Sequence, residues 1–343
     1  MTSFAWALIG PGRIAHKFAD AVQRSPGMHL AHVQGRDAGR AAAFAAQWTR
    51  DGRPAPTHGC DLAALLADPA VDGIYIATPH GQHAELIEAC LHAGKPVLCE
   101  KSMVASAAQA ERVVALARQR RVFLMEAMWT RFLPLYEAMR PWLADAEQGI
   151  GPVRAVQASF GFTPAYDPGS RLWDPAAAGG ALLDIGVYTL TAARWALEPA
   201  PGQAPALSHS HVTGLLAPNG VDLRVSALLA FEGGATAQFV CGLDLVGENA
   251  VHILGARGNL SIHSPFWGAT QATLRRPHDS SRPDEHLERP FEINGFEYQI
   301  REAVRCIRAG LGECPAMPLG ESLALAHWLD QARRSVGVHY PFD

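Results

Sequence analysis

The chain has 343 residues, of which 48% are hydrophobic and 18% charged, as expected of a folded protein with one or two sizeable cores rather than a disordered chain. Lys and Arg number 29 against 33 Asp and Glu, and this net charge of −4 provides no basic surplus for nucleic-acid binding. Since no uninterrupted apolar run approaches the roughly 20 residues of a membrane span, we expect neither a nucleic-acid nor a membrane partner.

The beginning of the chain and its cysteines predict a cytoplasmic protein. The first residues lack the cationic start and long apolar stretch of a secretion signal. The six cysteines show no C-x-x-C pair or metal-finger spacing, in a chain large enough to fold without disulfides. We therefore expect reduced, mostly buried thiols and no bound metal.

Up to about Met125, short apolar runs alternate with Ala-rich stretches of helical periodicity. The runs lie at 4–9, 30–33, 73–77, 96–99 and 122–125. This alternation predicts βαβ units and a parallel sheet, because parallel neighbours need a crossover between them.

Beyond Met125 the pattern changes. The expected elements are a helix over 133–146, a strand over 154–162, a Pro- and Gly-rich loop to 179 and a helix over about 182–196. Strand-like runs follow at 222–231, 235–241, 250–254, 259–263 and 272–275, separated by glycine turns. We expect exposed loops at 199–205 and 275–290, and helices at 294–309 and 320–335 that return to one of the cores. This half is predicted to carry an antiparallel or mixed sheet.

A glycine-rich turn follows the first strand and opens the first helix. It comprises Gly10, Pro11, Gly12, Arg13, Ile14 and Ala15. The first glycine permits a tight turn, the second lets the backbone approach a pyrophosphate, and the helix N-terminus attracts the anion. The turn predicts a dinucleotide-binding Rossmann domain over 1–125, followed by a second domain over 126–343, to which the resemblance given below assigns substrate binding and oligomerisation. The alternative is a purely structural turn.

The end of the second strand bears on which dinucleotide binds. An acidic residue there would hydrogen-bond the ribose 2′-hydroxyl of NAD, but this chain has Gly35 followed by Arg36, with Arg40 one helical turn later. Space and positive charge favour the 2′-phosphate of NADP, with NAD possible. The alternative is that both arginines are solvated and that Asp37, the expected helix N-cap, contacts the ribose.

Two polar segments end strands at the carboxyl edge, where ligands of open α/β sheets bind. One contains Glu100, Lys101 and Ser102; the other contains Thr78, Pro79, His80 and His83. Lysine at that edge donates to a substrate oxygen and stabilises an alkoxide, while glutamate fixes the lysine or faces the cofactor. The alternative is a solvated Glu-Lys pair.

In their order along the chain, these motifs resemble the glucose-fructose oxidoreductase / inositol dehydrogenase / MocA family. The resemblance covers nearly the whole chain and rests on four motifs: Gly10-x-Gly12-x-x-Ala15, Thr78-Pro79-His80-x-x-His83, Glu100-Lys101-Ser102 and Asp184-x-x-x-Tyr188. It implies an N-terminal Rossmann domain and a C-terminal α+β domain with a large open sheet.

Longer strings are similar to the subgroup that contains dimeric dihydrodiol dehydrogenase and NADP-linked D-xylose dehydrogenase. They span 125–132, 171–175 and 179–184. The resemblance implies hydride transfer between a nicotinamide and a sugar, polyol or dihydrodiol-type alcohol or carbonyl. It also implies a homo-oligomer, with the C-terminal sheet as dimer face; the low charge fits an apolar face buried against a second subunit.

The chain departs from the family pattern at two positions. Ser102 replaces the proline of the E-K-P motif, which frees φ and restores a backbone donor, so a less rigid backbone is expected. His80 stands where many relatives have asparagine, which leaves its contact with the nicotinamide ribose open.

The catalytic expectation rests on Lys101, Asp184 and Tyr188. Asp184 and Tyr188 are four residues apart on the predicted helix and would project from one face. A phenol with a pKa of about 10 is a poor base unless positive charge lowers that pKa. Lys101 would supply the charge and polarise the reacting oxygen, Tyr188 would exchange its proton, and Asp184 would orient the substrate. The alternative for Tyr188 is a half-buried aromatic on an amphipathic helix.

Four further residues are candidates for a pocket that stacks against a ring: Trp129, Arg131, Phe162 and Trp173. Two rival functions stay open: a regulatory protein that senses NADP without turnover, and an enzyme that keeps its nucleotide bound through the cycle.

Overall fold

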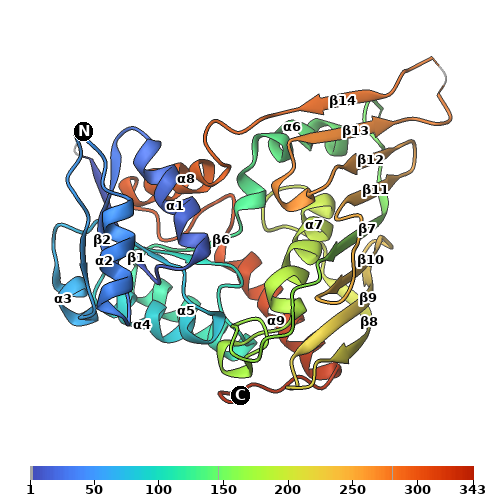
Figure 1. Cartoon of the computed structure of the whole chain (residues 1–343). Helices are drawn as coiled ribbons and strands as arrows, with labels where there is room; N and C mark the ends of the chain where they lie inside the picture. Colours follow the sequence, from blue (N-terminus) through green and yellow to red (C-terminus); the bar gives the residue numbers. More distant parts are fainter. Residues whose placement is uncertain (1–2, 146, 280) are drawn as a thin grey trace. The chain divides into compact units, whose positions relative to one another are not determined.

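The computed structural model describes residues 3–145, 147–279 and 281–343. The chain forms two compact units (Figure 1): Met1–Trp129 with Glu292–Leu323, and Thr130–Phe291 with Ala324–Asp343. The chain leaves the first unit close to the predicted boundary at 125. It returns to that unit for 292–323, so the first unit is discontinuous in sequence.

The first unit contains a parallel sheet. Its strands are β1 (Phe4–Ile9), β2 (Met28–Gln34), β3 (Thr57–Gly59), β4 (Gly73–Ile76), β5 (Val97–Glu100) and β6 (Leu124–Ala127). Their order is β3-β2-β1-β4-β5-β6, with each neighbouring pair parallel. The strand order reverses between β1 and β4, the switch point where open α/β sheets bind ligands.

Helices α1 (Arg13–Arg24), α2 (Ala38–Gln47), α3 (Leu62–Ala67), α4 (His83–His92), α5 (Ala107–Arg120) and α8 (Phe296–Arg308) belong to this unit. Phe18 of α1 stacks on Tyr75 of β4, with ring centroids 3.8 Å apart. Helix α8 is held to α1 by Asn294, whose Nδ2 donates to the Lys17 carbonyl and the Asp20 carboxylate. The return segment therefore completes the first unit, as expected for one of the final helices.

The second unit contains a mixed sheet. Its strands are β7 (Val153–Gly161), β8 (Leu207–Leu216), β9 (Asp222–Phe231), β10 (Thr236–Gly242), β11 (Val251–Gly255), β12 (Asn259–Ile262), β13 (Gln271–Arg275) and β14 (Glu285–Glu288). Their order is β14-β13-β12-β11-β7-β10-β9-β8, in which β7 and β10 pair in parallel and the other neighbours pair antiparallel.

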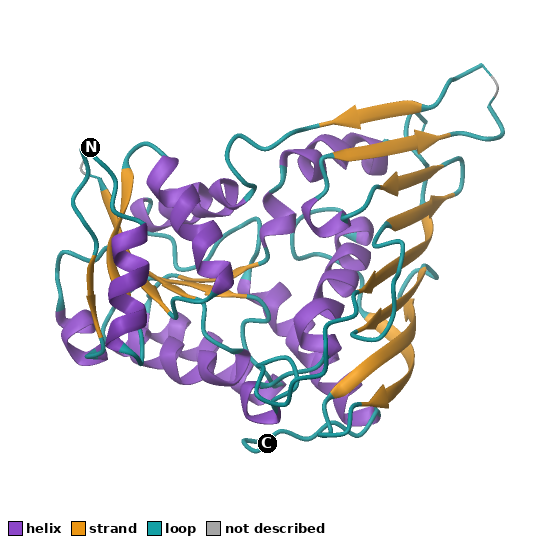
Figure 2. Ribbon diagram, in the orientation of Figure 1, coloured by secondary structure: helices purple, strands orange, loops and turns teal. Residues whose placement is uncertain are grey.

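Helices cover one face of this sheet (Figure 2). They are α6 (Pro134–Ala144), α7 (Val187–Leu197) and the C-terminal part of α9 (Leu319–Ser335), a helix that begins in the first unit. Trp328 of α9 meets the inward-facing Phe239 of β10 edge-on, at 5.6 Å between ring centroids. The predicted end of the first of these helices, at 146, lies outside the described residues; α6 ends at Ala144.

Within the described residues, one helical stretch, Pro175–Leu197, is long and apolar enough to cross a membrane. Polar residues interrupt this stretch, so a search for an uninterrupted apolar run does not find it. Since 94% of its apolar window is buried, we interpret it as a core helix rather than a membrane span.

Strands β3, β8 and β14 were not predicted. Each lies at an edge of its sheet. Most of their residues are exposed, and β14 falls inside the segment 275–290 that was expected to be a loop. Edge strands form by backbone pairing along one side and need little apolar sequence, so hydrophobic periodicity does not reveal them.

Candidate functional site

The glycine turn after β1 has the shape that a pyrophosphate requires. Gly10 has φ of +93°, and a Cβ there would lie 2.8 Å from Thr78 Cγ2 and 2.9 Å from the Ala77 carbonyl carbon. Gly12 is the N-cap of α1 and provides no side-chain cap for the first amides of that helix. A phosphate at this helix N-terminus would satisfy those amides, so the residues fit a bound dinucleotide. Arg13 and Ile14 follow, both exposed.

The end of β2 is followed by two exposed arginines and a capping aspartate. Arg36 and Arg40 are exposed, and Gly35 is partly so. Asp37 is the N-cap of α2, as expected, and its Oδ1 accepts a hydrogen bond from the Arg40 amide at 2.7 Å. The cap engages one of the two carboxylate oxygens, and we favour the two arginines over Asp37 as the groups that meet the ribose substituent.

The turn that carries Lys101 is held by histidines from the segment after β4. His83 is fully buried, with Nε2 2.8 Å from the Thr78 carbonyl and Nδ1 3.1 Å from the Ser102 carbonyl. His80 Nε2 lies 3.1 Å from the Lys101 carbonyl. Burial lowers the pKa of His83, whereas the hydrogen bonds to these backbone carbonyls raise it. A neutral imidazole carries one N–H, so in that form the ring donates to one of the two segments and packs against the other.

A buried carboxyl group supports the same turn from β6. Glu126 Oε1 accepts a hydrogen bond from the Met103 amide at 2.9 Å. Burial raises the pKa of Glu126 to about 7. The peptide bond between Lys101 and Ser102, where the family motif has proline, is cis.

Glu100 faces the interior of the first unit. Its Oε1 accepts a hydrogen bond from the Tyr75 hydroxyl at 2.5 Å. Lys17 of α1 lies in the field of Glu100 and of Glu297, although burial lowers the pKa of this lysine overall. Glu100 is therefore an internal hydrogen-bonding and charge partner, while the half-buried Lys101 beside it is the more accessible of the pair.

In the second unit, Asp184 and Tyr188 lie on one continuous helical segment. The segment begins as a π-helix, Leu182–Gly186, and continues as α7. Asp184 Oδ1 accepts hydrogen bonds from both terminal nitrogens of Arg171, at 3.0 and 3.1 Å. Tyr188 is buried, with its ring 5.8 Å from that of Phe160. Single π turns within helices are frequent at functional sites, and the sequence periodicity did not reveal this one.

The start of this helical segment is fixed by Asp222 at the beginning of β9. Asp222 Oδ2 accepts a hydrogen bond from the Leu182 amide at 2.5 Å. Gly180 has φ of +116°, and a Cβ there would lie 2.1 Å from Asp222 Oδ1. The carboxyl group thus fits only against a glycine, and burial raises the pKa of Asp222 to about 7.

The four predicted pocket residues do not share one environment. Trp129 belongs to the first unit, where its ring lies 5.1 Å from Phe296 and 4.8 Å below Lys17 Nζ. Arg131 belongs to the second unit and is buried there, with one terminal nitrogen 2.7 Å from Glu198 Oε1. This buried ion pair gives Arg131 a structural role, so we do not include Arg131 in the proposed pocket.

The other two pocket candidates lie in the loop region after β7. Trp173 is buried, donates from Nε1 to the Ala165 carbonyl at 3.2 Å, and meets Tyr166 edge-on at 5.1 Å. Phe162 is partly exposed immediately after β7. These aromatic side chains belong to the same unit as the Arg171–Asp184 pair. That Phe162 and Trp173 stack against a substrate ring stays a prediction.

The structure thus brings the predicted cofactor residues together at the carboxyl edge of the first sheet. Sequence reasoning assigned no role to Glu126, Arg171 or Asp222. Arg171 and Glu126 each lie in a sequence string that resembles the family, at 171–175 and 125–132, and this resemblance could have marked them as candidates. Asp222 had no signal, because its partner Leu182 is remote in sequence.

Comparisons with known proteins agree with this architecture. A family model described as "Oxidoreductase family, NAD-binding Rossmann fold" matches residues 4–128, and the GFO/IDH/MocA C-terminal domain matches 136–261. Trans-1,2-dihydrobenzene-1,2-diol dehydrogenase is 36% identical in Sus scrofa and 34% in Homo sapiens, each match covering 98% of both chains. A crystal structure of a 3-ketoreductase from Actinomadura kijaniata with NADP and TDP-benzene covers 99% of both chains, with a TM-score of 0.83 and 27% identity.

These matches confirm the fold class and the nicotinamide dinucleotide expected from the sequence. They extend over both units and agree with the glycine turn at the switch point and with the mixed sheet of the second unit. The chain belongs to the GFO/IDH/MocA family of NAD(P)-binding oxidoreductases.

Proposed function

We propose that this protein is an NADP-preferring dehydrogenase or reductase that acts on an alcohol or carbonyl group of a sugar, polyol or dihydrodiol. The observation that carries the proposal is the anchored Lys101 turn, which His83 and Glu126 hold at the carboxyl edge beside the glycine turn. The named activities of the diol dehydrogenases and of the 3-ketoreductase support the reaction and the substrate class.

Preference for NADP is supported by the residues that follow β2. The exposed guanidinium groups of Arg36 and Arg40 suit the dianionic 2′-phosphate, and Gly35 leaves room for it. The Asp37 carboxylate accepts from the α2 N-terminus through Oδ1, which commits one of its two oxygens to the cap. When bound, the nicotinamide ring accepts or supplies the hydride.

The chain's own residues would handle the proton and the substrate oxygen. Lys101 donates to the reacting oxygen and stabilises negative charge on it. Tyr188 exchanges the proton of the hydroxyl or carbonyl group. Asp184, oriented by Arg171 at 3.0 Å, accepts hydrogen bonds from the substrate and holds it in place.

The decisive experiment is a panel of aldoses, polyols and dihydrodiols with NADP and with NAD, followed at the absorbance band of the reduced nicotinamide. Turnover with a polyhydroxylated substrate is expected. Lys101→Ala and Tyr188→Phe should each lower kcat by orders of magnitude while nucleotide affinity is largely kept. Lys95→Ala and Tyr298→Phe are matched controls outside the proposed machinery.

Two outcomes would overturn this mechanism. Near-wild-type kcat in either catalytic variant would remove that residue from it. Tight nucleotide binding without turnover on any substrate of the panel would instead favour the NADP-sensing alternative.

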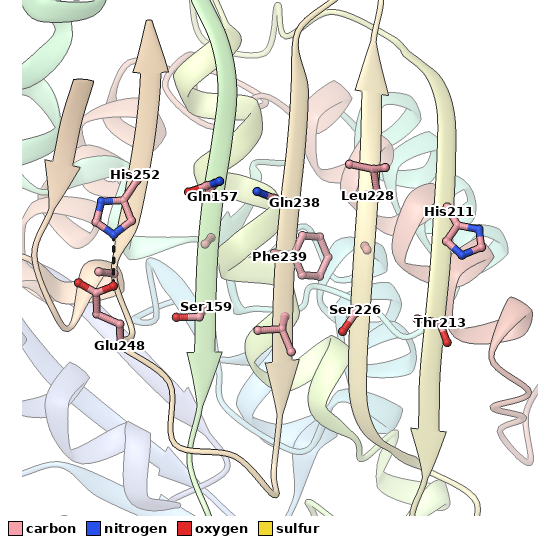
Figure 3. A pocket seen from close by; sticks show the side chains of 14 residues that line it. Gln157, Ser159, His211, Thr213, Ser226, Leu228, Gln238, Phe239, Glu248 and His252 are labelled. Carbon is pink, nitrogen blue, oxygen red and sulfur yellow. Dashed lines mark hydrogen bonds and ion pairs between the residues drawn. The ribbon is translucent and has the colours of Figure 1, made fainter. Parts of the chain in front are cut away.

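We further propose a homodimer formed through the outer face of the second sheet. Figure 3 shows this face, a shallow groove of about 570 Å³ across β8, β9, β10, β7 and β11. The side chains that line it include Gln157, Ser226, Leu228 and Gln238. The face combines apolar with uncharged polar side chains, and its burial against a second subunit stays a prediction. A centre poor in charge still supports an interface, since charged residues are depleted there.

A further inference from the structure

We propose that Glu302, Cys306 and Cys314 form a binding site for a thiophilic divalent cation, with Zn²⁺ as the fitting ion. The ligand atoms of these residues all lie within 4.8 Å of one another, and both thiols are buried. The site belongs wholly to the first unit and is independent of the proposed reaction.

The local fold explains how the three side chains meet. Glu302 and Cys306 are four residues apart on α8 and so share one face of that helix. The chain then turns back: the Leu311 amide donates to the Cys306 carbonyl, and Cys314 forms an isolated bridge with Met317. This reversal places the third ligand over the last turns of α8.

The distances match a tetrahedral site. Glu302 Oε1 lies 3.6 Å from Cys306 Sγ and 3.9 Å from Cys314 Sγ. With Zn–S near 2.3 Å and Zn–O near 2.0 Å, a tetrahedron has S···O edges of about 3.5 Å. Both S···O separations are therefore within a few tenths of an ångström, about 0.1–0.4 Å, of those of such a site, and the two sulfur atoms lie within 4.8 Å of one another. Glu302 is about a quarter exposed, which leaves an open side for water as the fourth ligand.

Arg305 orients the carboxylate and balances the charge. Its Nε lies 2.7 Å from Glu302 Oε2, and its Nη2 lies 2.7 Å from Oε1 and 3.5 Å from Cys306 Sγ. Two thiolates, one carboxylate, Zn²⁺ and one guanidinium sum to zero. Metal ligands commonly have such second partners, which fix their orientation.

Protonation of the two thiols should make cation binding depend on pH. Without a cation, burial raises the pKa of Cys306 to about 12 and also raises the pKa of Cys314. Binding must therefore displace the thiol protons, and affinity should increase as the pH rises. Hydrogen bonding from Arg305 lowers the pKa of Glu302, which supplies one ligand already ionised.

The site lies away from the nucleotide turns. The Gly312 carbonyl, between the two cysteines, accepts from the Leu124 amide at the beginning of β6. This is the amino edge of the sheet, whereas Lys101 follows the end of β5 at the carboxyl edge. The ion would thus join α8 to the segment leading toward α9 and would stabilise the first unit rather than take part in the reaction.

The test uses the full-length, tag-free chain, reduced, stripped with a chelator and titrated with Co²⁺ and then Zn²⁺. We expect one Co²⁺ per chain with a thiolate charge-transfer band that Zn²⁺ abolishes, and a higher Tm with Zn²⁺. Cys306→Ser/Cys314→Ser should lose the band. Glu302→Gln keeps both thiolates, so the band should remain while affinity falls by about tenfold or more. Cys60→Ser, which removes an exposed thiol elsewhere, should bind as the wild type does.

Each other outcome would overturn the proposal. A folded, fully reduced wild type without a charge-transfer band has no such site. An equal band in the double variant would place the cation elsewhere, and Co²⁺ affinity unchanged in Glu302→Gln would exclude the carboxylate. A Cys306–Cys314 disulfide that forms in air and is neither slowed nor prevented by Zn²⁺, seen as a mass loss of two hydrogens, would show a redox pair instead.

Discussion

The carboxyl group of Asp222 and the backbone amide of Leu182 form a 2.5 Å hydrogen bond in the interior of the second unit. This contact fixes the beginning of the π-helical turn that carries Asp184 and leads into α7, which carries Tyr188. Asp222 therefore helps to position the helical segment that carries both candidate catalytic side chains, although it is remote from them in sequence.

This contact predicts a distinct pH dependence of stability. Burial raises the pKa of Asp222 from 3.8 to about 7, so the folded state binds more protons than the unfolded state between these values. Stability from this group is then lost as pH rises from about 4 to 7. In Asp222→Asn, the decrease in unfolding free energy between pH 5 and pH 8 should be smaller than in the wild type by about 3 kcal/mol.

Urea unfolding at both pH values measures this difference. Glu126, whose pKa is also raised to about 7, contributes equally to wild type and variant and cancels in the comparison. Asp222→Ala removes the acceptor altogether and should cost about 1–3 kcal/mol at both pH values. Parallel pH profiles for wild type and Asp222→Asn would contradict the assignment.

Cofactor preference should depend on Arg36. Because its guanidinium is proposed to bind the 2′-phosphate, Arg36→Ala should weaken NADP binding by about tenfold to a hundredfold and leave NAD nearly unchanged. Fluorescence titration with both nucleotides gives the ratio, and Arg24→Ala, at the end of α1, is the control. Equal losses for both nucleotides would remove the phosphate contact.

His83 is predicted to act as a positioning residue. It lies between the Thr78 and Ser102 carbonyls, so His83→Ala should loosen the Lys101 turn, lower kcat and destabilise the fold by about 1–3 kcal/mol. His83→Gln should recover part of kcat because an amide donates to the same carbonyls. Steady-state kinetics with nucleotide Kd values separates this role from a purely structural one, for which kcat per folded molecule would not change.

The proposed dimer should be sensitive to charge at Leu228. This side chain of β9 is 53% exposed and lines the groove on the outer sheet face. In a twofold interface, Leu228→Glu places two carboxylates near one another and should raise the dimer Kd by about a hundredfold. Sedimentation velocity over a range of concentrations measures the shift. Leu311→Glu, an exposed leucine of the first unit, is the control, and a wild type that sediments as a monomer would exclude the interface.

Local sequence was sufficient for the nucleotide turn and for strands in both units. The strand at 4–9 has the predicted bounds because its residues are all buried and apolar, and the strand at 222–231 alternates clearly between buried and more exposed positions. The glycine turn was also predictable, since Gly10 needs both a positive φ and freedom from a Cβ. Hydrophobic periodicity and backbone steric limits depend on only a few neighbouring residues, so they can be recognised directly in the sequence.

The sequence by itself thus determined the family, the Rossmann unit, the nucleotide turn and the identity of the candidate catalytic residues. Only the tertiary structure decided their surroundings: Arg131 pairs with the remote Glu198, Asp222 caps the turn at Leu182, and Cys314 folds back onto α8. Hydrogen bonds, burial and ion pairs depend on distances between segments far apart in the chain. Such distances arise only when the core packs, and no local pattern encodes them.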